Sequence, residues 1–412
     1  MVKASALYLV VIVALLIAIL SASLLSVSFF YRQEVKKKER FDKLLLNLRS
    51  GTSIVLSDGF LKSAASKHID LFGGLADSVI VQKDSWGVFN LGLVHAFELR
   101  DTLKRSFLIG NKFDDTNAIY LADEDRPLSV SGNTRITGDG QLPKSGLRQS
   151  YVDGKPYTGK ELIKGKITNS NLQLPPLNSA LLKSIEEQFK YTEGIQFDSR
   201  DSIGNSFFSP TQIFNLAQDQ LNLSSGKLEG RIVLISDTTL TISAGMKLNN
   251  VQIYAPAIVV NEGFKGSCQL FAQDSIVIGK NCVFEYPSFA GVFKTAASKV
   301  QAKISLNDGV RFSGILLSYE SKRTDLQTMI SIGKNCIING EVFATGYIKL
   351  NSGLKVNGKV TAKRFLMQTA STIYENYLID FTLNRKLLSQ YYLSAPIFKA
   401  NQVDQKVLKW LN

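Results

Sequence analysis

The 412-residue chain has few of the residues that carry most enzyme chemistry, with two His, three Cys, four Met and two Trp. Histidine and cysteine supply most zinc ligands, so this composition leaves little material for a histidine or thiolate metal site. The odd number of cysteines excludes a framework in which every cysteine is disulfide-bonded. Nine Pro against 30 Gly exclude collagen-like and proline-rich chains.

Sequence motifs for catalysis or cofactor binding are also absent. The chain contains no P-loop, no GxGxxG, no zinc-ligand spacing and no GxSxG motif. His68 and His95 lie in partly apolar segments, where a lone histidine is usually structural. The sequence therefore predicts no catalytic residue, no cofactor and no metal ligand.

An uncharged segment occupies the N-terminal part of the sequence. From Ala4 to Tyr31 there are 28 positions without a charged side chain, and nearly all are apolar. About 20 such residues cross the hydrocarbon core of a bilayer as a helix, whereas a signal peptide has an apolar run of about 7–15. We therefore predict an uncleaved, single-pass membrane anchor. Its apolar residues include Leu7, Val10, Ile12, Leu15, Ile19, Leu24 and Phe29.

A basic segment follows this span. Its cationic residues are Arg32, Lys36, Lys37, Lys38, Arg40 and Lys43. Because only Lys3 and the terminal amine precede the span, the positive-inside rule taken alone predicts a cytoplasmic C-terminal part. Further on, Phe41, Leu44 and Leu48 recur at three- and four-residue spacing. This spacing predicts that the same helix continues to about residue 54 with one apolar face.

The N-terminal layout resembles type IV pilin-like proteins of the PilX/GspK type. The resemblance is carried by residues 3–7 (KASAL), the apolar run, the basic stretch and the small-residue segment 49–53 (RSGTS). It ends near residue 60, and it lacks the glycine of the prepilin-peptidase site and the glutamate after it. The resemblance implies a bacterial inner-membrane protein with an extracytoplasmic soluble part that assembles with other envelope proteins.

The second half of the chain repeats with an 18-residue period. The sequence IGKNC occurs at 278–282 and at 332–336, and units beginning at 239, 257, 275, 303, 329 and 347 share one apolar phase. Apolar residues at every second position mark strands with one buried face, and small residues about every six positions mark corners. Residues 293–302 and 321–328 are insertions at one corner. Each unit is therefore predicted to be one triangular coil.

The predicted fold class is mainly β, an 18-residue-per-coil β-solenoid (parallel β-helix) with a helical insertion, preceded by the long helix. Stacked coils bury a continuous apolar column. Cys282 and Cys336 share the offset of Leu354, so we expect buried, unreactive thiols. The predicted core residues are Ile276, Ile278, Cys282, Ile304, Leu306, Val310, Phe312, Ile330, Ile332, Cys336, Ile338, Val342, Ile348, Leu350, Leu354, Val356 and Val360.

This repeat resembles the bactofilin-type β-helix, and also the β-helical domain behind some PilX-like N termini. The resemblance covers residues from about 231 to 364 and implies fold more than function. Hexapeptide-repeat acyltransferases also use 18-residue coils. Those enzymes place a histidine base at a coil edge, and no coil here contains a histidine.

The segments around the repeat divide the chain into five parts, 1–54, 55–117, 118–230, 231–364 and 365–412. We expect 55–117 to form two strands around Trp86, packed beside the anchor helix. Residues 118–230 are predicted to start the solenoid and to carry helices at 175–191 and 210–221. Because a solenoid end exposes unpaired backbone, residues 365–412 are predicted to cap it with a helix around 384–391.

The net charge of +13 is concentrated in two parts of the chain. Residues 1–50 carry eight basic and three acidic side chains, and residues 231–364 carry 16 and eight. This excess favours anionic partners such as lipid headgroups, an anionic envelope polymer or an acidic protein face. Nucleic acid is disfavoured, because Lys and Arg of the repeat are scattered singly on alternate strand positions. The acidic residues of the repeat lie at differing offsets, so we expect them on a solvated outer face. They are Glu262, Asp274, Glu285, Asp308 and Glu341.

These observations favour a structural role over an enzymatic one. We expect a single-pass inner-membrane protein acting as a structural or assembly component, a pilin-like or secretion-associated minor subunit with protein partners. One alternative is a bactofilin-like scaffold that polymerises on the cytoplasmic face of the membrane. Another is a carbohydrate-binding or carbohydrate-acting β-helix, which needs paired carboxylates that the sequence does not show.

Overall fold

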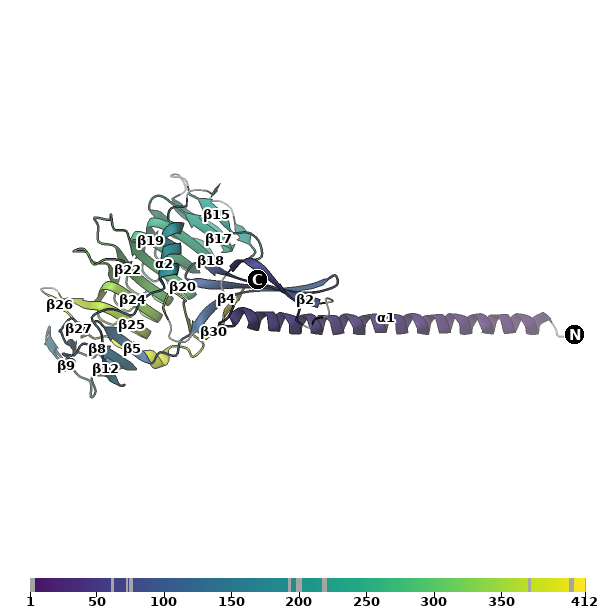
Figure 1. Ribbon diagram of the computed structural model, residues 1–412, viewed down its shortest axis with the longest axis horizontal. Coiled ribbons are helices and arrows are strands. Elements are labelled where there is room, and N and C mark those ends of the chain that lie inside the picture. The colour runs from purple at the N-terminus through teal and green to yellow at the C-terminus, as the bar shows by residue number, and fades with distance from the viewer. Residues whose placement is uncertain are drawn as a thin grey trace. The chain divides into compact units, whose positions relative to one another are not determined.

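The computed structural model describes residues 4–60, 63–71, 73, 77–191, 194–197, 202–216, 221–369, 372–399 and 404–411. The described chain is mainly β, with one long apolar helix at its N-terminal end (Figure 1). It forms two compact units. The first contains residues 1–83 and 92–105, and the second contains residues 84–91 and 106–412.

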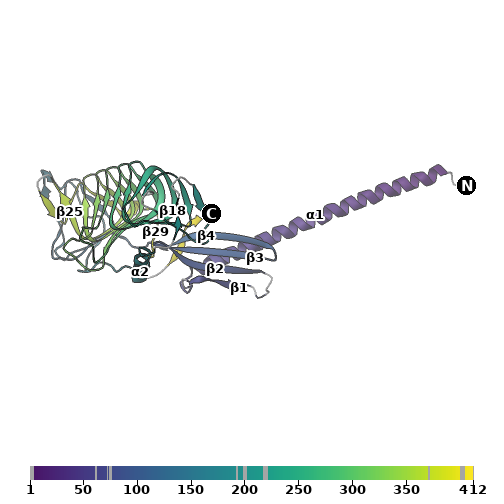
Figure 2. The same ribbon diagram turned by 90° about the horizontal axis from the view of Figure 1, so that it is seen from above.

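The first unit combines the long helix with antiparallel strands (Figure 2). The helix runs unbroken for 53 residues, because that stretch has no Pro and a single Gly. Strands β1 and β2 pair with Ile69 opposite Val79, and β2 and β3 flank Gly87, as the sequence predicts. The elements are α1 (Ala4–Leu56), β1 (Ser63–Ile69), β2 (Asp77–Trp86), β3 (Phe89–Glu98) and β4 (Asp101–Lys112), the last three continuing into the second unit.

The second unit is built on a closed sheet of mostly parallel strands, several of which are labelled in Figure 1. Ile330 lies opposite Ile348, 18 positions further along the chain, and Val342 lies opposite Val360 in the same register. The strands of the repeat are β18 (Leu240–Val260), β19 (Lys265–Ile278), β20 (Val283–Lys294), β21 (Lys303–Leu306), β22 (Arg311–Glu320), β23 (Met329–Ile332), β24 (Ile337–Leu350) and β25 (Lys355–Gln368).

Insertions and corners lie between the strands of the repeat and do not break the pairing of those strands. Ile276 pairs with Ile304, so the insertion at 293–302 lengthens the spacing without breaking the register. Between Asn249 and Val251, the pairing of β18 with β19 shifts its register by one residue. Asn281 and Asn335 of the two IGKNC segments form corners with φ of 56° and 55°, a conformation that asparagine tolerates.

The order of the stack differs from the predicted one. Strand β5 pairs with β25, Ile119 lying opposite Val360, so the coil after residue 117 lies beyond the last repeat rather than before the first. The segments Asn222–Gly230 and Ile232–Ile235 pair instead with β18, at the other end of the stack. The strands beyond β25 are β5 (Asn117–Leu121), β6 (Leu128–Ser131), β7 (Arg135–Thr137), β8 (Asp139–Leu142), β9 (Leu147–Gln149), β12 (Ile167–Asn169), β26 (Ile373–Glu375), β27 (Tyr377–Ile379) and β28 (Thr382–Asn384).

Two further strands form a small separate hairpin, and five more lead into β18. The hairpin pairs Tyr151 with Pro156. At the opposite end of the stack, Leu228 lies opposite Leu248. These strands are β10 (Tyr151–Val152), β11 (Lys155–Pro156), β13 (Ile195–Gln196), β14 (Ile203–Asn205), β15 (Gln212–Asn215), β16 (Asn222–Gly230) and β17 (Ile232–Ile235).

One of the three predicted helices of this unit is present. Helix α2 (Ser179–Gln188) begins after Asn178, whose side chain accepts a hydrogen bond from the Leu181 amide. The predicted helix at 210–221 is wrong. Phe214 lies in β15 opposite Leu234, because pairing with β17 satisfies this backbone, and residues 217–220 lie outside the described ones.

The predicted capping helix around 384–391 is also wrong. Only one 3₁₀ turn forms, η2 (Arg385–Leu387), because the Asn384 side chain accepts from the Lys386 amide and the Arg385 guanidinium bonds the Phe113 and Asp115 carbonyls. The chain then returns as β29 (Leu393–Ser394) and β30 (Gln405–Leu411), which both pair antiparallel with β4.

A second apolar layer covers one outer face of the closed sheet. Ile253 and Ala255 belong to the interior cluster, so Tyr254 between them faces outward, yet it is buried. Its ring stacks on Phe271 at 4.4 Å and meets Phe189, just after α2, at 5.3 Å. This face of the sheet is therefore buried on both sides.

Candidate functional site

The first half of α1 is the most exposed apolar surface of the described chain. From residue 6 onward the helix contains an 18-residue window of mean hydropathy 2.9 with none of it buried, so it is long and apolar enough to cross a membrane. A helix that is apolar all round needs a nonpolar environment. The predicted anchor residues are all exposed, namely Leu7, Val10, Ile12, Leu15, Ile19, Leu24 and Phe29.

The basic residues after this stretch divide into two groups. Arg32, Lys36, Lys37 and Lys38 are exposed on the helix surface. Two others bind the strands of the same unit. Arg40 Nε lies 2.9 Å from Asp101 Oδ2, and Lys43 Nζ lies 3.8 Å from Glu98 Oε1. The sequence predicted one basic cluster and did not show that its last two members are held by strand residues.

The second half of α1 packs against the strands of its own unit. Leu44 and Leu48 are buried there, as the three- and four-residue spacing predicts, and so is Val55. Phe41, which the same spacing placed on this face, is exposed because it lies before the packed part of the helix. Gly51 allows the closest approach, since a Cβ at that position would lie 2.6 Å from a methyl of Val79 and 2.7 Å from one of Val94. The helix is thus fixed to the sheet by its C-terminal half alone.

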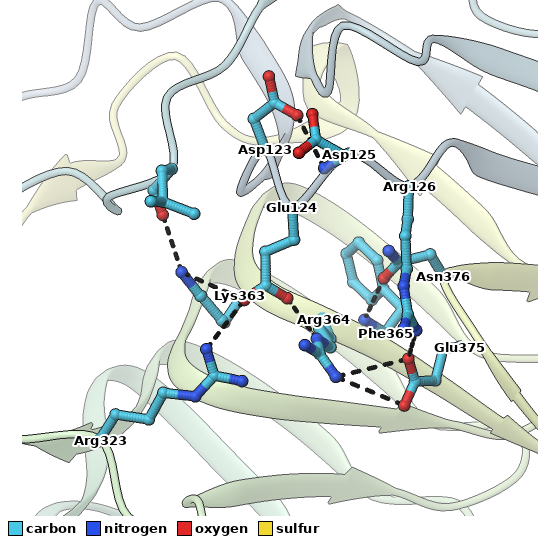
Figure 3. Close-up of polar contacts among 11 residues, drawn as sticks. Asp123, Glu124, Asp125, Arg126, Arg323, Lys363, Arg364, Phe365, Glu375 and Asn376 are labelled. Carbon is cyan, nitrogen blue, oxygen red and sulfur yellow. Dashed lines mark hydrogen bonds and ion pairs between the residues drawn. The ribbon is translucent and has the colours of Figure 1, made fainter.

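In the second unit, a charge cluster surrounds Glu124 (Figure 3). Glu124 lies in the loop after β5, and its carboxylate accepts hydrogen bonds from Arg364 of β25 and from Arg323 Nη1 at 3.1 Å. Lys363 Nζ lies 3.5 Å away and also donates to the Leu172 carbonyl at 2.9 Å. One carboxylate therefore joins the loop after β5, the last coil and the insertion at 321–328.

A second carboxylate extends the cluster. The Glu375 carboxylate of β26 accepts a hydrogen bond from the Arg126 guanidinium and lies 3.5 Å from Arg364 Nη1 (Figure 3). Beside it, the Asn376 side chain accepts from the Phe365 amide at 3.1 Å. Arg364 thus bridges two acids that come from different segments of the chain.

The electrostatics of this cluster favour a fixed ion-pair network over acid–base chemistry. Burial alone would raise the pKa of Glu124, but the Arg364, Lys363 and Arg323 cations outweigh burial and hold that pKa below its ordinary value. A carboxylate held ionised and saturated with cations is a poor proton donor or base. Among the residues that the structure describes, no three His, Cys, Asp or Glu side chains are grouped to hold a metal ion.

A third polar group lies beneath the C-terminal segment of the second unit. Glu341 is buried, and its Oε2 accepts hydrogen bonds from Ser394 Oγ and from Tyr392 Oη at 3.1 Å. Burial raises the pKa of the Glu341 carboxyl above its ordinary value, against the opposing effect of these hydrogen bonds and of Lys359. The prediction that Glu341 lies on a solvated outer face is wrong, because residues 392–394 cover it.

The other acids of the repeat make local contacts. Asp308 Oδ1 accepts from the Lys334 amide at 2.8 Å, and Asp274 Oδ1 accepts from Ser298 Oγ at 3.2 Å. Glu262 lies 3.5 Å from Asn281, and Glu285 is exposed. These bonds tie neighbouring coils together at their corners.

The predicted core residues belong to one buried cluster inside the closed sheet. It contains Ile276, Ile278, Cys282, Ile304, Leu306, Val310, Phe312, Ile330, Ile332, Cys336, Ile338, Val342, Ile348, Leu350, Leu354, Val356 and Val360. Burial raises the pKa of the Cys282 and Cys336 thiols, which favours the unreactive thiol form. The His68 ring lies 5.5 Å from the Phe97 ring in the first unit.

The sequence did not reveal the charge cluster or the covered outer face. The charge cluster joins residues as far apart as Glu124 and Arg364, so no local pattern announces it. The covered face did leave a signal. Ile315, Leu317 and Phe343 are apolar at outward offsets, and such continuous apolar runs are typical of strands buried on both sides.

Comparisons with known proteins give little further information. A scan against protein-family models finds no match, and a search of the curated proteins finds none. Among solved structures, the chain is similar to the competence-associated pilin ComZ from Thermus thermophilus, with 10% identity over 92% of this chain and 96% of that chain, at a TM-score of 0.25. A TM-score this low supports no functional conclusion.

Proposed function

We propose that the protein is a single-pass membrane-anchored structural or assembly component of the bacterial cell envelope, and that its closed sheet is a β-solenoid. The observation that carries this proposal is the division of α1. Its first half exposes an uninterrupted apolar surface, while its second half is packed against strands. A helix built in this way places a folded domain at a fixed height above a bilayer.

The description as an 18-residue-per-coil solenoid rests on the strand register. Where no insertion intervenes, paired residues such as Ile330 and Ile348 are 18 positions apart. Where an insertion does intervene, the pairing partners still occupy equivalent positions, as Ile304 and Ile330 do. A stack of equal coils offers large lateral surfaces and two ends, which suits a structural or assembly role.

The finer role is that of a pilin-like or secretion-associated minor subunit with protein partners or self-assembly. Its support is the N-terminal layout of an apolar span, a basic stretch and an amphipathic continuation of one helix. The basic excess of residues 231–364 favours an anionic envelope polymer or an acidic protein face as a further partner. No enzymatic activity is proposed, since Glu124 and Glu375 are engaged in ion pairs and Asp274 and Asp308 in corner contacts.

A cytoplasmic scaffold is the second candidate. The exposed Arg32 and Lys36–38 directly after the span favour, by the positive-inside rule, a cytoplasmic second unit. On that side, a bactofilin-like polymer formed end to end would be the role to test. A carbohydrate-acting β-helix is disfavoured because Glu341 is buried beneath the C-terminal segment.

Membrane anchoring can be tested directly. Replacing both Leu15 and Ile19 by Arg should move the protein from the carbonate-resistant membrane fraction to the soluble fraction, because each Arg at a helix centre costs about 2.5–3.5 kcal/mol of insertion free energy. Leu387→Arg, at an exposed apolar residue outside α1, is the matched control and should stay in the membrane. Retention of the double variant would overturn the anchor.

The side of the membrane on which the second unit lies distinguishes the pilin-like subunit from the cytoplasmic scaffold. Tyr151 is 72% exposed and the native cysteines are buried, so Tyr151→Cys provides a single accessible thiol. In intact bacterial spheroplasts, a membrane-impermeant maleimide should label this thiol if the second unit is extracytoplasmic. Labelling only after lysis would reject the pilin-like role and favour the cytoplasmic scaffold.

A further inference from the structure

The turn between β3 and β4 carries an exposed leucine in an unfavourable conformation. Leu99 is 79% exposed, and its φ is +53°. Hairpin turns favour Gly, Asn or Asp where φ is positive, because a bulky side chain is strained there. A single exposed leucine is ordinary on a protein surface. At this position, however, a leucine makes the turn less stable than Gly, Asn or Asp would, so turn stability does not explain why a leucine is there.

Three contacts within the first unit fix the direction in which this turn points. Val94 lies beside Gly51, Glu98 lies 3.8 Å from Lys43, and Asp101 lies 2.9 Å from Arg40. Strand β3 therefore runs antiparallel to α1, toward its apolar half (Figure 2). The turn at residues 99–100 is the end of the strands that lies nearest the predicted membrane.

The remaining distance is short. Arg40 lies nine residues after Tyr31, about 14 Å along the helix at 1.5 Å per residue. Leu99 and Arg100 form the two-residue tip between Glu98 and Asp101, so the turn projects beyond Asp101 by about one residue, about 3 Å. Leu99 is therefore about 10 Å from the level of Tyr31. The headgroup layer is about 5–7 Å thick on each side of the hydrocarbon core, and the usual tilt of a transmembrane helix, about 20°, brings the turn a few ångströms nearer to it.

The charge around the turn matches an anionic surface. Arg100 is exposed at the tip beside Leu99, and the exposed Lys36, Lys37 and Lys38 lie on α1 between the span and the Arg40–Asp101 pair. An apolar side chain flanked by cations is the pattern that binds the interface of an anionic bilayer, the apolar group inserting among headgroups while the cations meet phosphates.

We propose that the β3–β4 turn is a membrane-interface contact in which Leu99 inserts among the headgroups and Arg100 binds anionic lipid phosphates. This proposal rests on the proposed membrane span of α1. Together, the span and the turn attach the first unit at two points. A single helix would leave that unit free to rotate and tilt above the bilayer.

Lipid-quenching fluorescence on the full chain tests this contact. Leu99→Cys, labelled with an environment-sensitive dye, is reconstituted into phosphatidylcholine vesicles containing about 30% phosphatidylglycerol and headgroup-spin-labelled lipid. The native cysteines are buried and do not compete for the dye. We expect quenching at least about twofold stronger than for a dye on Ser57→Cys, an exposed position of the same unit about 39 Å along the helix direction from Tyr31, and weaker in about 0.5 M salt. Equal quenching at the two positions would overturn the proposal.

Two substitutions separate the contributions of the two side chains. With the dye on Thr102→Cys, an exposed neighbour in β4, Leu99→Asn and Arg100→Gln should each reduce quenching toward the Ser57 value. Asparagine suits a positive φ, so folding of the turn is preserved or improved. Unchanged quenching in both variants would also reject the contact.

A third dye position tells failure of the contact from failure of the anchor. Ile19→Cys should be quenched by lipid spin-labelled on the acyl chain if α1 spans the bilayer. Quenching at position 19 without quenching at position 99 rejects the turn contact alone. Absence of quenching at both positions rejects the span and, with it, the proposal that rests on it.

Discussion

Glycines at one corner of the closed sheet let successive coils touch backbone to backbone. Gly314, Gly340 and Gly358 have φ of 144°, 144° and 154°, values that residues with a side chain rarely adopt. A Cβ on Gly340 would lie 2.0 Å from the Gly314 carbonyl oxygen. These glycines therefore set the spacing between coils, which no larger residue could maintain.

Gly340→Ala should destabilise the second unit by roughly 3–5 kcal/mol, because it adds both backbone strain and a clash with a carbonyl that cannot move alone. Urea unfolding of the full chain in detergent measures the loss. Gly204→Ala is the control, since a Cβ there meets nothing within 4 Å, and it should change stability by less than about 1 kcal/mol. A similar effect of both substitutions would contradict the close approach.

Glu341 makes stability depend on pH with a definite sign. Its folded-state pKa is raised by burial, so the protonated form is the one that the fold favours. The stability that this residue contributes is complete below the unfolded pKa of about 4.5 and is lost as pH rises through the folded pKa. Glu341→Gln should therefore gain stability relative to the parent across that window and keep the gain at higher pH. Equal pH profiles for the parent and Glu341→Gln, with exposed Glu285→Gln as control, would reject this account.

At the scale of elements, the Glu124 cluster attaches the loop after β5 to β25 and to the insertion at 321–328. Glu124→Gln should destabilise the second unit by about 2–3 kcal/mol at neutral pH, since it leaves partly buried cations without their carboxylate. The pKa of Glu124 is lowered in the fold, so its contribution is present above the ordinary pKa and is lost as pH falls through the folded value. The difference from the parent should thus shrink as the pH is lowered through the folded value. Glu187→Gln, at an exposed pair on α2, should change little at neutral or at acidic pH.

Sequence periodicity predicted the elements whose residues carry their own signal. The apolar run and the following leucines predicted α1, and the 18-residue phase predicted the core column from Ile276 to Val360. The 18-residue apolar phase predicts that a segment forms a coil, but it does not predict which other coil that segment pairs with. The pairing of Ile119 with Val360 was therefore missed. At 210–221, a short apolar run around Phe214 fits helix and strand equally, and pairing with β17 decides for the strand.

The candidate site was predictable only where it is continuous in sequence. The anchor residues and the basic stretch follow one another along α1, so composition alone located them. The partners of Glu124 and Glu341 come from distant segments, and their burial depends on what covers them. Leu99 carries no sequence signal, because it is distinguished only by its positive φ and by its position between Glu98 and Asp101, the residues that contact α1.

At the scale of the whole molecule, a stack of equal coils should tolerate the loss of one. Deleting residues 337–354 joins Cys336 to Lys355 and lets β25 take the place of β24 opposite β22, since Arg311 pairs with Ile337 and Ile337 with Lys355. Each coil contacts only its neighbours, so the interior column closes again in register. We expect this variant to keep one cooperative urea transition, with a midpoint within about 1 M of the parent's.

A deletion of half that length, 337–345, tests whether the 18-residue coil is the structural unit. An odd shift reverses which side chains face inward, so the residues that follow would present polar groups to the interior and apolar ones to solvent. This shorter deletion removes Glu341 and Phe343 just as the longer one does, so the loss of the contacts beneath residues 392–398 is common to both. Circular dichroism and urea unfolding should show a folded protein for the full-coil deletion and a disrupted one for the half-coil deletion. Equal damage from both would mean that the coils are not interchangeable units, and the proposed solenoid would have to be abandoned.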